Sequence, residues 1–158
     1  FHLTAVAGIG LIHSCCQMDI VMSQVFDKMD LRDNRGSWDF SRYIPDVVTV
    51  CLGQNDGIQD SALFCGAYVR FIGDIRRRYP QAQIVCLSSP MGDKTLTDVQ
   101  KRYLGGIVAS MRQSGEQKVS SFFFSRQFSH GCGGHPDLEE HGLIAAELTG
   151  YLKKLMGW

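Results

Sequence analysis

The sequence predicts an α/β protein with three layers, in which a parallel sheet carries helices on both of its faces. Short apolar runs of strand length alternate with longer segments whose apolar residues recur at helical spacing. The apolar runs lack a polar alternation, which is typical of parallel strands that are covered on both sides. No repeat or low-complexity segment interrupts the pattern, so we expect a single domain over residues 1–158.

Each expected element follows from hydrophobic periodicity and from the residues that end it. The expected strands cover residues 1–8, 47–52, 82–89 and 118–125, and the expected helices cover residues 17–29, 61–79, 95–115 and 135–157. Residues 31–45 are rich in turn-forming residues and predict a loop. Pro80 closes the second helix, and the three arginines before it complement the negative end of the helix dipole.

Composition argues against several classes of partner. Lys plus Arg and Asp plus Glu both number 16, so no basic field attracts nucleic acid. No apolar stretch approaches the roughly 20 residues that a membrane helix needs, and we expect no membrane partner. The six cysteines form no CxxC pair and no Cys/His spacing typical of zinc. We therefore expect buried free thiols and neither a disulfide framework nor a metal site.

Three of the expected strand ends carry candidate functional residues. The motif AGIG follows the first strand at 7–10, GQND follows the second at 53–56, and HGCGGHP follows the fourth at 130–136. Glycines expose backbone N–H groups, an Asn side chain is a donor that cannot ionise, and His is the commonest general base. Each motif alone also fits a structural role, as a tight turn, a helix cap or a structural histidine. Together, neutral donors and an imidazole are what acyl transfer needs around a tetrahedral oxyanion.

These motifs resemble conserved blocks of the SGNH (GDSL-type) hydrolases. GQND resembles the third block, GxND; CGGHP resembles the fifth, usually DxxHP; and AGIG resembles the second. Over nearly the whole chain, the sequence is most similar to the second carbohydrate esterase family, which removes acetyl groups from plant polysaccharides. The resemblance implies a flavodoxin-like sheet, no cofactor and no metal, and a partner that is an acylated carbohydrate or another small ester.

The resemblance also implies residue roles. Asn55 is expected to donate to the oxyanion through its side chain, and Gly8 through its backbone N–H, with Gly10 as the alternative donor. His135 is expected to act as general base and then as general acid toward the leaving alcohol. Trp38 and Tyr43 are expected to pack in the loop, with stacking on a sugar as the alternative.

The sequence departs from the family pattern at two places. Cys132 stands where the Asp of DxxHP is expected, so a Ser-His dyad held by a backbone carbonyl is favoured over a full triad, with Asp137 as a weak substitute. The GDS block that carries the nucleophile is not visible. None of five serines sits in a GDS-like turn: Ser14, Ser37, Ser88, Ser89 and Ser125. We therefore expect the first strand to be missing from this chain and the serine to come from an N-terminal fragment or segment.

The sequence is also compatible with two other functions. A serine-less relative that binds a glycan or an ester without turnover is the main alternative. A flavodoxin-like regulatory domain would need a phosphate-binding loop or an acidic cluster at the first strand ends, and neither is visible. The esterases that the chain resembles imply a periplasmic or secreted protein, although unpaired cysteines fit an oxidising compartment poorly.

Overall fold

The computed structural model describes residues 1–31 and 35–158 and contains a parallel sheet of three strands in the order β3-β4-β5. The strands are β3 (Val47–Val50), β4 (Gln83–Leu87) and β5 (Val119–Phe122), and the long helices are α2 (Ser61–Arg78), α3 (Lys94–Gln113) and α4 (Leu138–Met156). Val48 of β3 lies beside Ile84 of β4, which lies beside Val119 of β5. The expected strands and helices after residue 46 are thus confirmed, each with ends shifted by a few residues.

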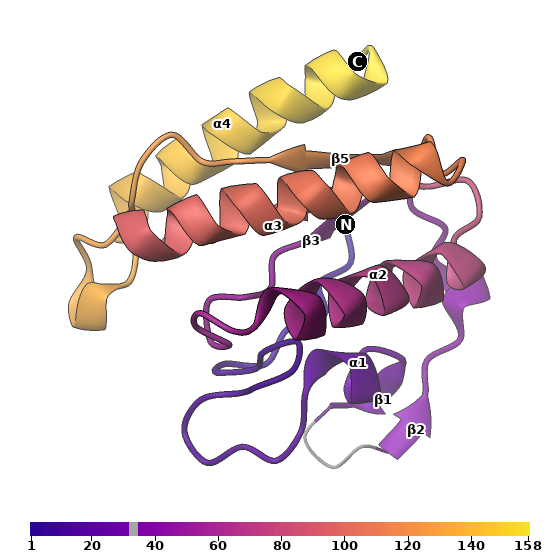
Figure 1. Cartoon of the computed structure of the whole chain (residues 1–158), viewed down its shortest axis with the longest axis horizontal. Coiled ribbons are helices and arrows are strands. Elements are labelled where there is room, and N and C mark those ends of the chain that lie inside the picture. The colour runs from indigo at the N-terminus through magenta and orange to yellow at the C-terminus, as the bar shows by residue number, and fades with distance from the viewer. Residues whose placement is uncertain (32–34) are drawn as a thin grey trace.

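The two faces of the sheet bury different residues of the same strand. Ile84 and Cys86 of β4 belong to the core that α2 and α3 cover, whereas Val85 and Leu87 belong to the core beneath α4. Figure 1 shows α4 across β5 from α3. Because successive side chains of a strand point to opposite faces, both faces are apolar and both need helices. The predicted three-layer architecture is confirmed.

The first expected strand, over residues 1–8, is wrong. Residues 1–6 form no regular strand, and a turn follows at Ala7 and Gly8, with the N–H of Ile9 donating to the carbonyl of Val6 over 3.2 Å. A strand is stable only where a neighbouring strand accepts its ladder hydrogen bonds. Among the described residues, no strand pairs with this segment, so it remains irregular.

The expected helix over residues 17–29 is also wrong for most of its length. Only α1 (Met22–Val25) is helical, and β1 (Lys28–Asp30) pairs antiparallel with β2 (Arg35–Ser37). The Ser14 hydroxyl donates to the carbonyl of Ile20 over 2.6 Å, and the N–H of Met22 donates to Gly10. These contacts hold the segment as a loop against residues 8–14 and override its helical periodicity.

The expected loop over residues 31–45 contains β2 and the 3₁₀ helix η1 (Phe40–Arg42). Residues 32–34 of that prediction lie outside the described residues.

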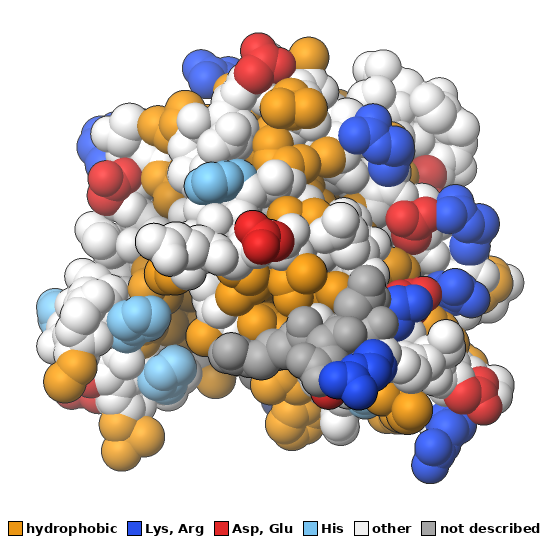
Figure 2. Space-filling model, turned by 90° about the horizontal axis from the view of Figure 1, so that it is seen from below, with side chains coloured by type: hydrophobic (Ala, Val, Ile, Leu, Met, Phe, Trp, Pro, Cys, Tyr) orange, Lys and Arg blue, Asp and Glu red, His pale blue; other side chains and the backbone are white. Residues whose placement is uncertain are grey.

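On the face that carries β1 and β2, Lys and Arg side chains lie among Asp and Glu side chains. Hydrophobic side chains are visible between them (Figure 2).

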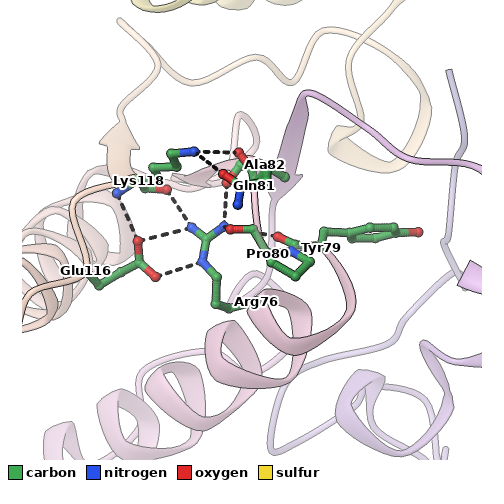
Figure 3. Close-up of polar contacts among 7 residues, drawn as sticks. All are labelled: Arg76, Tyr79, Pro80, Gln81, Ala82, Glu116 and Lys118. Atoms are coloured by element: carbon green, nitrogen blue, oxygen red, sulfur yellow. Dashed lines mark hydrogen bonds and ion pairs between the residues drawn. The ribbon is translucent and has the colours of Figure 1, made fainter. Parts of the chain in front are cut away.

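The carboxyl end of α2 is held by Arg76 (Figure 3). Its guanidinium donates to the carbonyls of Tyr79 and Ala82 at 3.1 and 2.6 Å, and it pairs with Glu116 at 2.7 Å. Burial alone raises the pKa of Glu116, but the hydrogen bonds from Arg76 and from the Lys118 N–H lower it below its ordinary value. The network joins α2 to the loop before β5, at the amino ends of β4 and β5.

A cavity of about 680 Å³ lies beside β3. Its walls are residues 1–6, β3 itself, and the inner side of α4 at Leu148 and Leu152. In the described part of the chain, β3 pairs with β4 alone, so the edge of β3 that faces away from β4 has no strand beside it. Such an edge presents unpaired N–H and C=O groups. Among the helices described, none is both long and apolar enough to cross a membrane.

The cysteine prediction needs correction. Cys15 and Cys16 are joined by a disulfide, and Cys51 and Cys132 are exposed residues. Only Cys86 is a buried free thiol, and there desolvation raises the pKa to about 12. Adjacent cysteines carry no sequence signal that separates a bonded pair from two thiols. The Cys51 thiol donates to the carbonyl of Ser88 at 3.7 Å, and desolvation raises its pKa to about 11 although the residue as a whole is exposed.

Candidate active site

Asn55 lies in the loop that follows β3. Gly53 begins this loop with φ +114°, a conformation that favours glycine, and a Cβ there would lie 2.9 Å from Nε2 of Gln100. The side-chain amide of Asn55 donates to the carbonyl of Ile9 over 2.8 Å. One N–H of this amide therefore orients the side chain toward the Gly8–Gly10 turn. The second N–H has no acceptor among the described residues.

Asp56, the next residue, binds the backbone that directly follows this turn. Its carboxylate accepts the N–H groups of Leu11 at 2.9 Å, Ile12 at 2.7 Å and His13 at 3.1 Å. Only 2% of the residue is exposed, and the three backbone donors replace the water that a carboxylate otherwise needs. Asn55 and Asp56 together hold the 8–14 segment against the end of β3.

Gly8 and Gly10 differ in the use of their N–H groups. The N–H of Gly10 donates to the Ser14 hydroxyl at 2.9 Å, whereas the described residues offer no acceptor for the N–H of Gly8. Gly8 has φ +84°. A Cβ at Gly8 would lie 2.8 Å from Sγ of Cys15, so the disulfide-bonded Cys15 packs directly against this glycine.

The tip of β4 is tied to the same loop. Gln54 accepts a hydrogen bond from the Ser89 hydroxyl, and Gln100 of α3 accepts the Ser89 N–H at 2.7 Å. Gln100 is 2% exposed and its Nε2 has no partner among the described residues. A polar residue at a helical core position is the sequence signal for this contact, and the strand-end motifs alone do not reveal it.

The described serines close to the site are engaged in structural hydrogen bonds. Ser14 and Ser89 are bonded as described above, the buried Ser88 hydroxyl accepts the N–H of Phe124 at 3.1 Å, and the Ser125 hydroxyl donates to Glu147 at 2.5 Å. None of these hydroxyls is hydrogen-bonded to a histidine in the described part of the chain.

His135 lies between the 3₁₀ helix η2 (Cys132–Gly134) and Asp137, the N-cap of α4. Its N–H donates to the carbonyl of Cys132 at 3.2 Å, and its carbonyl accepts the N–H of Gly131 at 2.7 Å. The residue is exposed, and its imidazole makes no hydrogen bond or ion pair with any described residue. The carboxylate of Asp137 accepts the N–H of Glu140 at 2.8 Å, so this side chain is used as a helix cap.

Glu140 anchors the segment that leads to His135. It is 1% exposed and accepts the His130 N–H at 2.8 Å and a hydrogen bond from Arg126 at 3.3 Å. Burial alone raises the pKa of Glu140, yet the hydrogen bond and the charge of His130 lower it below its ordinary value. Ligand atoms of His130, Asp137 and Glu140 lie within 4.8 Å of one another. The hydrogen bonds among these three residues explain why they lie close together: they anchor the loop before α4.

Trp38 and Tyr43 pack on His2. The rings of Trp38 and His2 are 4.7 Å apart, and those of Tyr43 and His2 are 5.9 Å apart. This confirms the expected packing role for both aromatic side chains, which also line the cavity beside β3.

The carboxyl edge of the sheet brings the candidate motifs to one side of the molecule. The loop after β3 and the segment with η2 both extend beyond the carboxyl ends of the strands (Figure 1). The Asn55–Ile9 hydrogen bond brings the Gly8 turn to the same edge. In parallel α/β sheets, ligands bind at this edge. The arrangement offers the Asn55 amide, the Gly8 N–H and the His135 imidazole, and in the described residues it includes no activated nucleophile.

No family model matches the sequence, but curated and solved proteins do. The chain is 37% identical over 127 residues to the cellulase/esterase CelE of Acetivibrio thermocellus, covering 77% of this chain and 16% of that protein. It is 32% identical over 130 residues to the acetylxylan esterase/glucomannan deacetylase of Cellvibrio japonicus, covering 77% of this chain and 34% of that protein. The matched part of the chain thus spans 16% of the length of the first relative and 34% of the second.

The fold is similar to that of a solved relative. A family two carbohydrate esterase from Clostridium thermocellum, solved in complex with cellohexaose, has a TM-score of 0.86 and 32% identity, covering 96% of this chain and 48% of that one. The sequence matches thus cover about three quarters of this chain, and the fold match covers almost all of it. The chain is similar in sequence and fold to family 2 carbohydrate esterases and matches part of the length of each of these relatives.

Proposed function

We propose that this chain is part of a serine esterase that removes acyl groups, foremost acetyl groups, from carbohydrate. The observation that carries the proposal is the hydrogen bond of Asn55 to Ile9, because it joins a side-chain donor to the turn of Gly8 at the carboxyl edge of the sheet. The names of the two curated relatives, an esterase and a deacetylase, and the cellohexaose bound to the solved relative support the substrate class.

Each residue has a role in the proposed reaction. A serine hydroxyl attacks the acyl carbon while the His135 imidazole takes its proton. The oxyanion that forms accepts hydrogen bonds from the second N–H of the Asn55 amide and from the Gly8 N–H. His135 then returns the proton to the leaving sugar hydroxyl, and the acyl-serine is hydrolysed by a water that His135 deprotonates. The engaged N–H of Gly10 supports Gly8 over Gly10 as the backbone donor.

We propose that the serine is carried by a segment outside residues 1–158 that lies beside β3. The cavity there separates residues 1–6 from β3 and is lined by Val48, Val50 and Leu148. A parallel strand in this cavity would pair with the open edge of β3 and end at the carboxyl edge, next to Asn55. Ser14, Ser88, Ser89 and Ser125 are each committed to a structural hydrogen bond, which also favours a serine from elsewhere.

The proposal includes a periplasmic or extracellular location. The Cys15–Cys16 disulfide supports it, because disulfides persist in oxidising compartments.

The test of the function compares two histidines in the full-length protein on acetylated xylan and an aryl acetate. We expect His135→Ala to lower kcat about 10²–10⁴-fold, the usual contribution of a general base. His141→Ala is the matched control, because His141 is exposed on α4 and is expected to leave kcat unchanged. Equal kcat values for the two variants would contradict the proposed role of His135.

The test of the serine segment is intact-mass and N-terminal analysis of the purified protein, followed by an assay of residues 1–158 alone. We expect residues 1–158 to be inactive alone and active when joined to, or associated with, a segment that bears the serine. Hydrolysis by residues 1–158 alone would place the nucleophile within them. A full-length protein that binds acetylated oligosaccharides without hydrolysing them would instead establish the alternative, a non-catalytic glycan-binding or ester-binding relative.

A further inference from the structure

The buried carboxylate of Asp56 is bonded to the turn of the candidate oxyanion site and not to a cation in the described structure. It accepts hydrogen bonds from three consecutive N–H groups, those of Leu11, Ile12 and His13. The residue is 2% exposed. Three converging backbone N–H groups form a concave anion site, which fits a carboxylate closely. The 8–14 segment thus takes its shape from a side chain that lies over 40 positions further along the chain.

The surrounding contacts give this segment a single arrangement. A Cβ at Gly10 would overlap the carbonyl oxygen of His13 and lie 2.7 Å from Oδ2 of Asp56, so only glycine fits against the carboxylate. The N–H of Gly10 donates to Ser14 at 2.9 Å, which closes the turn from its other side. Ile9, directly before this turn, accepts the hydrogen bond of Asn55, and Gly8 is its neighbour in the chain.

We propose that Asp56 is a positioning residue for the oxyanion site, acting through the backbone of residues 11–13 on the N–H of Gly8. Asn55 contacts the oxyanion in the proposed reaction, and Asp56, its neighbour, sets where the second donor lies relative to it. Loss of the carboxylate leaves the N–H groups of residues 11–13 without their acceptor, that of Leu11 in a buried position. Residues 8–14 are then free to rotate the Gly8 N–H away from Asn55. This inference rests on the proposed esterase function and deepens it.

The test compares Asp56→Asn, Asp56→Ala and Asp60→Ala in the full-length protein. Asp60 is the matched control, because its carboxylate accepts the N–H of Leu63 as the N-cap of α2 and lies in the same connection between β3 and α2. We expect Asp56→Ala to lower kcat about 10²-fold with little change in KM, the size of effect seen when one oxyanion donor is lost. Asp56→Asn keeps one acceptor oxygen, so we expect it to lower kcat by less than Asp56→Ala does. Asp60→Ala is expected to keep kcat within about twofold at a temperature where all variants are folded.

Amide hydrogen exchange of the same variants gives a readout that needs no turnover. We expect exchange at Leu11, Ile12 and His13 to accelerate in the Asp56 variants and to stay at the wild-type rate in Asp60→Ala. An Asp56→Asn protein with wild-type kcat and wild-type exchange at these amides would overturn the inference. A wild-type protein that hydrolyses no ester would overturn the proposed function, and in that case the exchange data still decide whether Asp56 holds the turn.

Discussion

The side-chain amide of Asn55 donates a 2.8 Å hydrogen bond to the carbonyl of Ile9, a residue 46 positions earlier in the chain. This contact joins the loop after β3 to the residue after Gly8, and no described residue accepts the second N–H of the amide. A donor that is already oriented stabilises developing charge at little reorganisation cost.

Replacement of Asn55 tests that role. We expect Asn55→Ala and Asn55→Asp both to lower kcat about 10²–10³-fold, because neither side chain donates to an oxyanion. The measurement is steady-state kinetics of the full-length protein on an acetyl ester. Gln81→Ala, at the amino ends of the strands, is the control and is expected to retain the wild-type kcat. A wild-type kcat in Asn55→Asp would exclude the amide as a donor.

Two glycines are expected to respond in opposite ways to alanine. Gly10→Ala forces a Cβ into the carbonyl of His13, and we expect the free energy of unfolding to fall by about 1–3 kcal/mol. Gly106 is exposed in α3, and a Cβ there meets nothing within 4 Å. We therefore expect Gly106→Ala to raise the free energy of unfolding by about 0.4–1 kcal/mol. Urea unfolding measures both, and destabilisation of the same size in both variants would refute the clash at Gly10.

The Arg76–Glu116 network predicts a dependence of stability on pH. The pKa of Glu116 is lowered in the folded chain, so its contribution is complete above its unfolded pKa and is lost as the pH falls through the folded pKa. We expect Glu116→Gln to be less stable than the wild type at pH 7 and to approach it in acid. Because the pair is about one fifth exposed, we expect a loss near 1 kcal/mol.

The control for this prediction is the pair of Arg77 and Asp74. The Arg77 side chain is 74% exposed, so Arg77→Ala is expected to change the free energy of unfolding by less than about 0.5 kcal/mol. Chemical denaturation from pH 3 to 7 separates the two variants. A stability difference between Glu116→Gln and the wild type that is constant over this range would contradict the lowered pKa.

Thiol labelling tests the cysteine assignment. Four cysteines are free and two form the Cys15–Cys16 disulfide. We therefore expect four labels per unfolded chain of residues 1–158 without reductant and six after reduction, counted by mass spectrometry. In the folded protein we expect Cys132 to react well before Cys86, because Cys132 is exposed whereas burial raises the pKa of Cys86 to about 12. Six labels without reductant would exclude the disulfide.

The layered fold was predictable because its signals are local. The apolar runs at Val47–Val50 and Gln83–Leu87 are flanked by long amphipathic segments, and Pro80 and Gly115 mark where helices stop. The GQND and CGGHP motifs likewise identified the two loops of the candidate site. These features depend on neighbours in sequence, and the later part of the chain follows them closely.

The first 45 residues were poorly predicted because distant contacts decide them. Residues 17–21 have helical periodicity, yet the hydrogen bonds of Ile20 to Ser14 and of Met22 to Gly10 hold them in a loop. Residues 1–6 read as a strand and remain irregular, because strand formation needs a partner that this segment does not have among the described residues. In this segment, tertiary hydrogen bonds override the secondary-structure propensity of the residues.

By itself, the sequence determined the order of strands and helices after residue 46, the buried character of the sheet and the motifs at its carboxyl edge, since periodicity and turn residues act over short range. Only the tertiary structure decided that Asp56 binds Leu11–His13, that Gly10 rather than Gly8 gives up its N–H to Ser14, and that Cys15 packs against Gly8. The contact of Asp56 joins segments more than 40 residues apart, which meet only when β3 and the loop before it are in place. Hydrogen bonds between such segments depend on positions in space, and no local pattern encodes them.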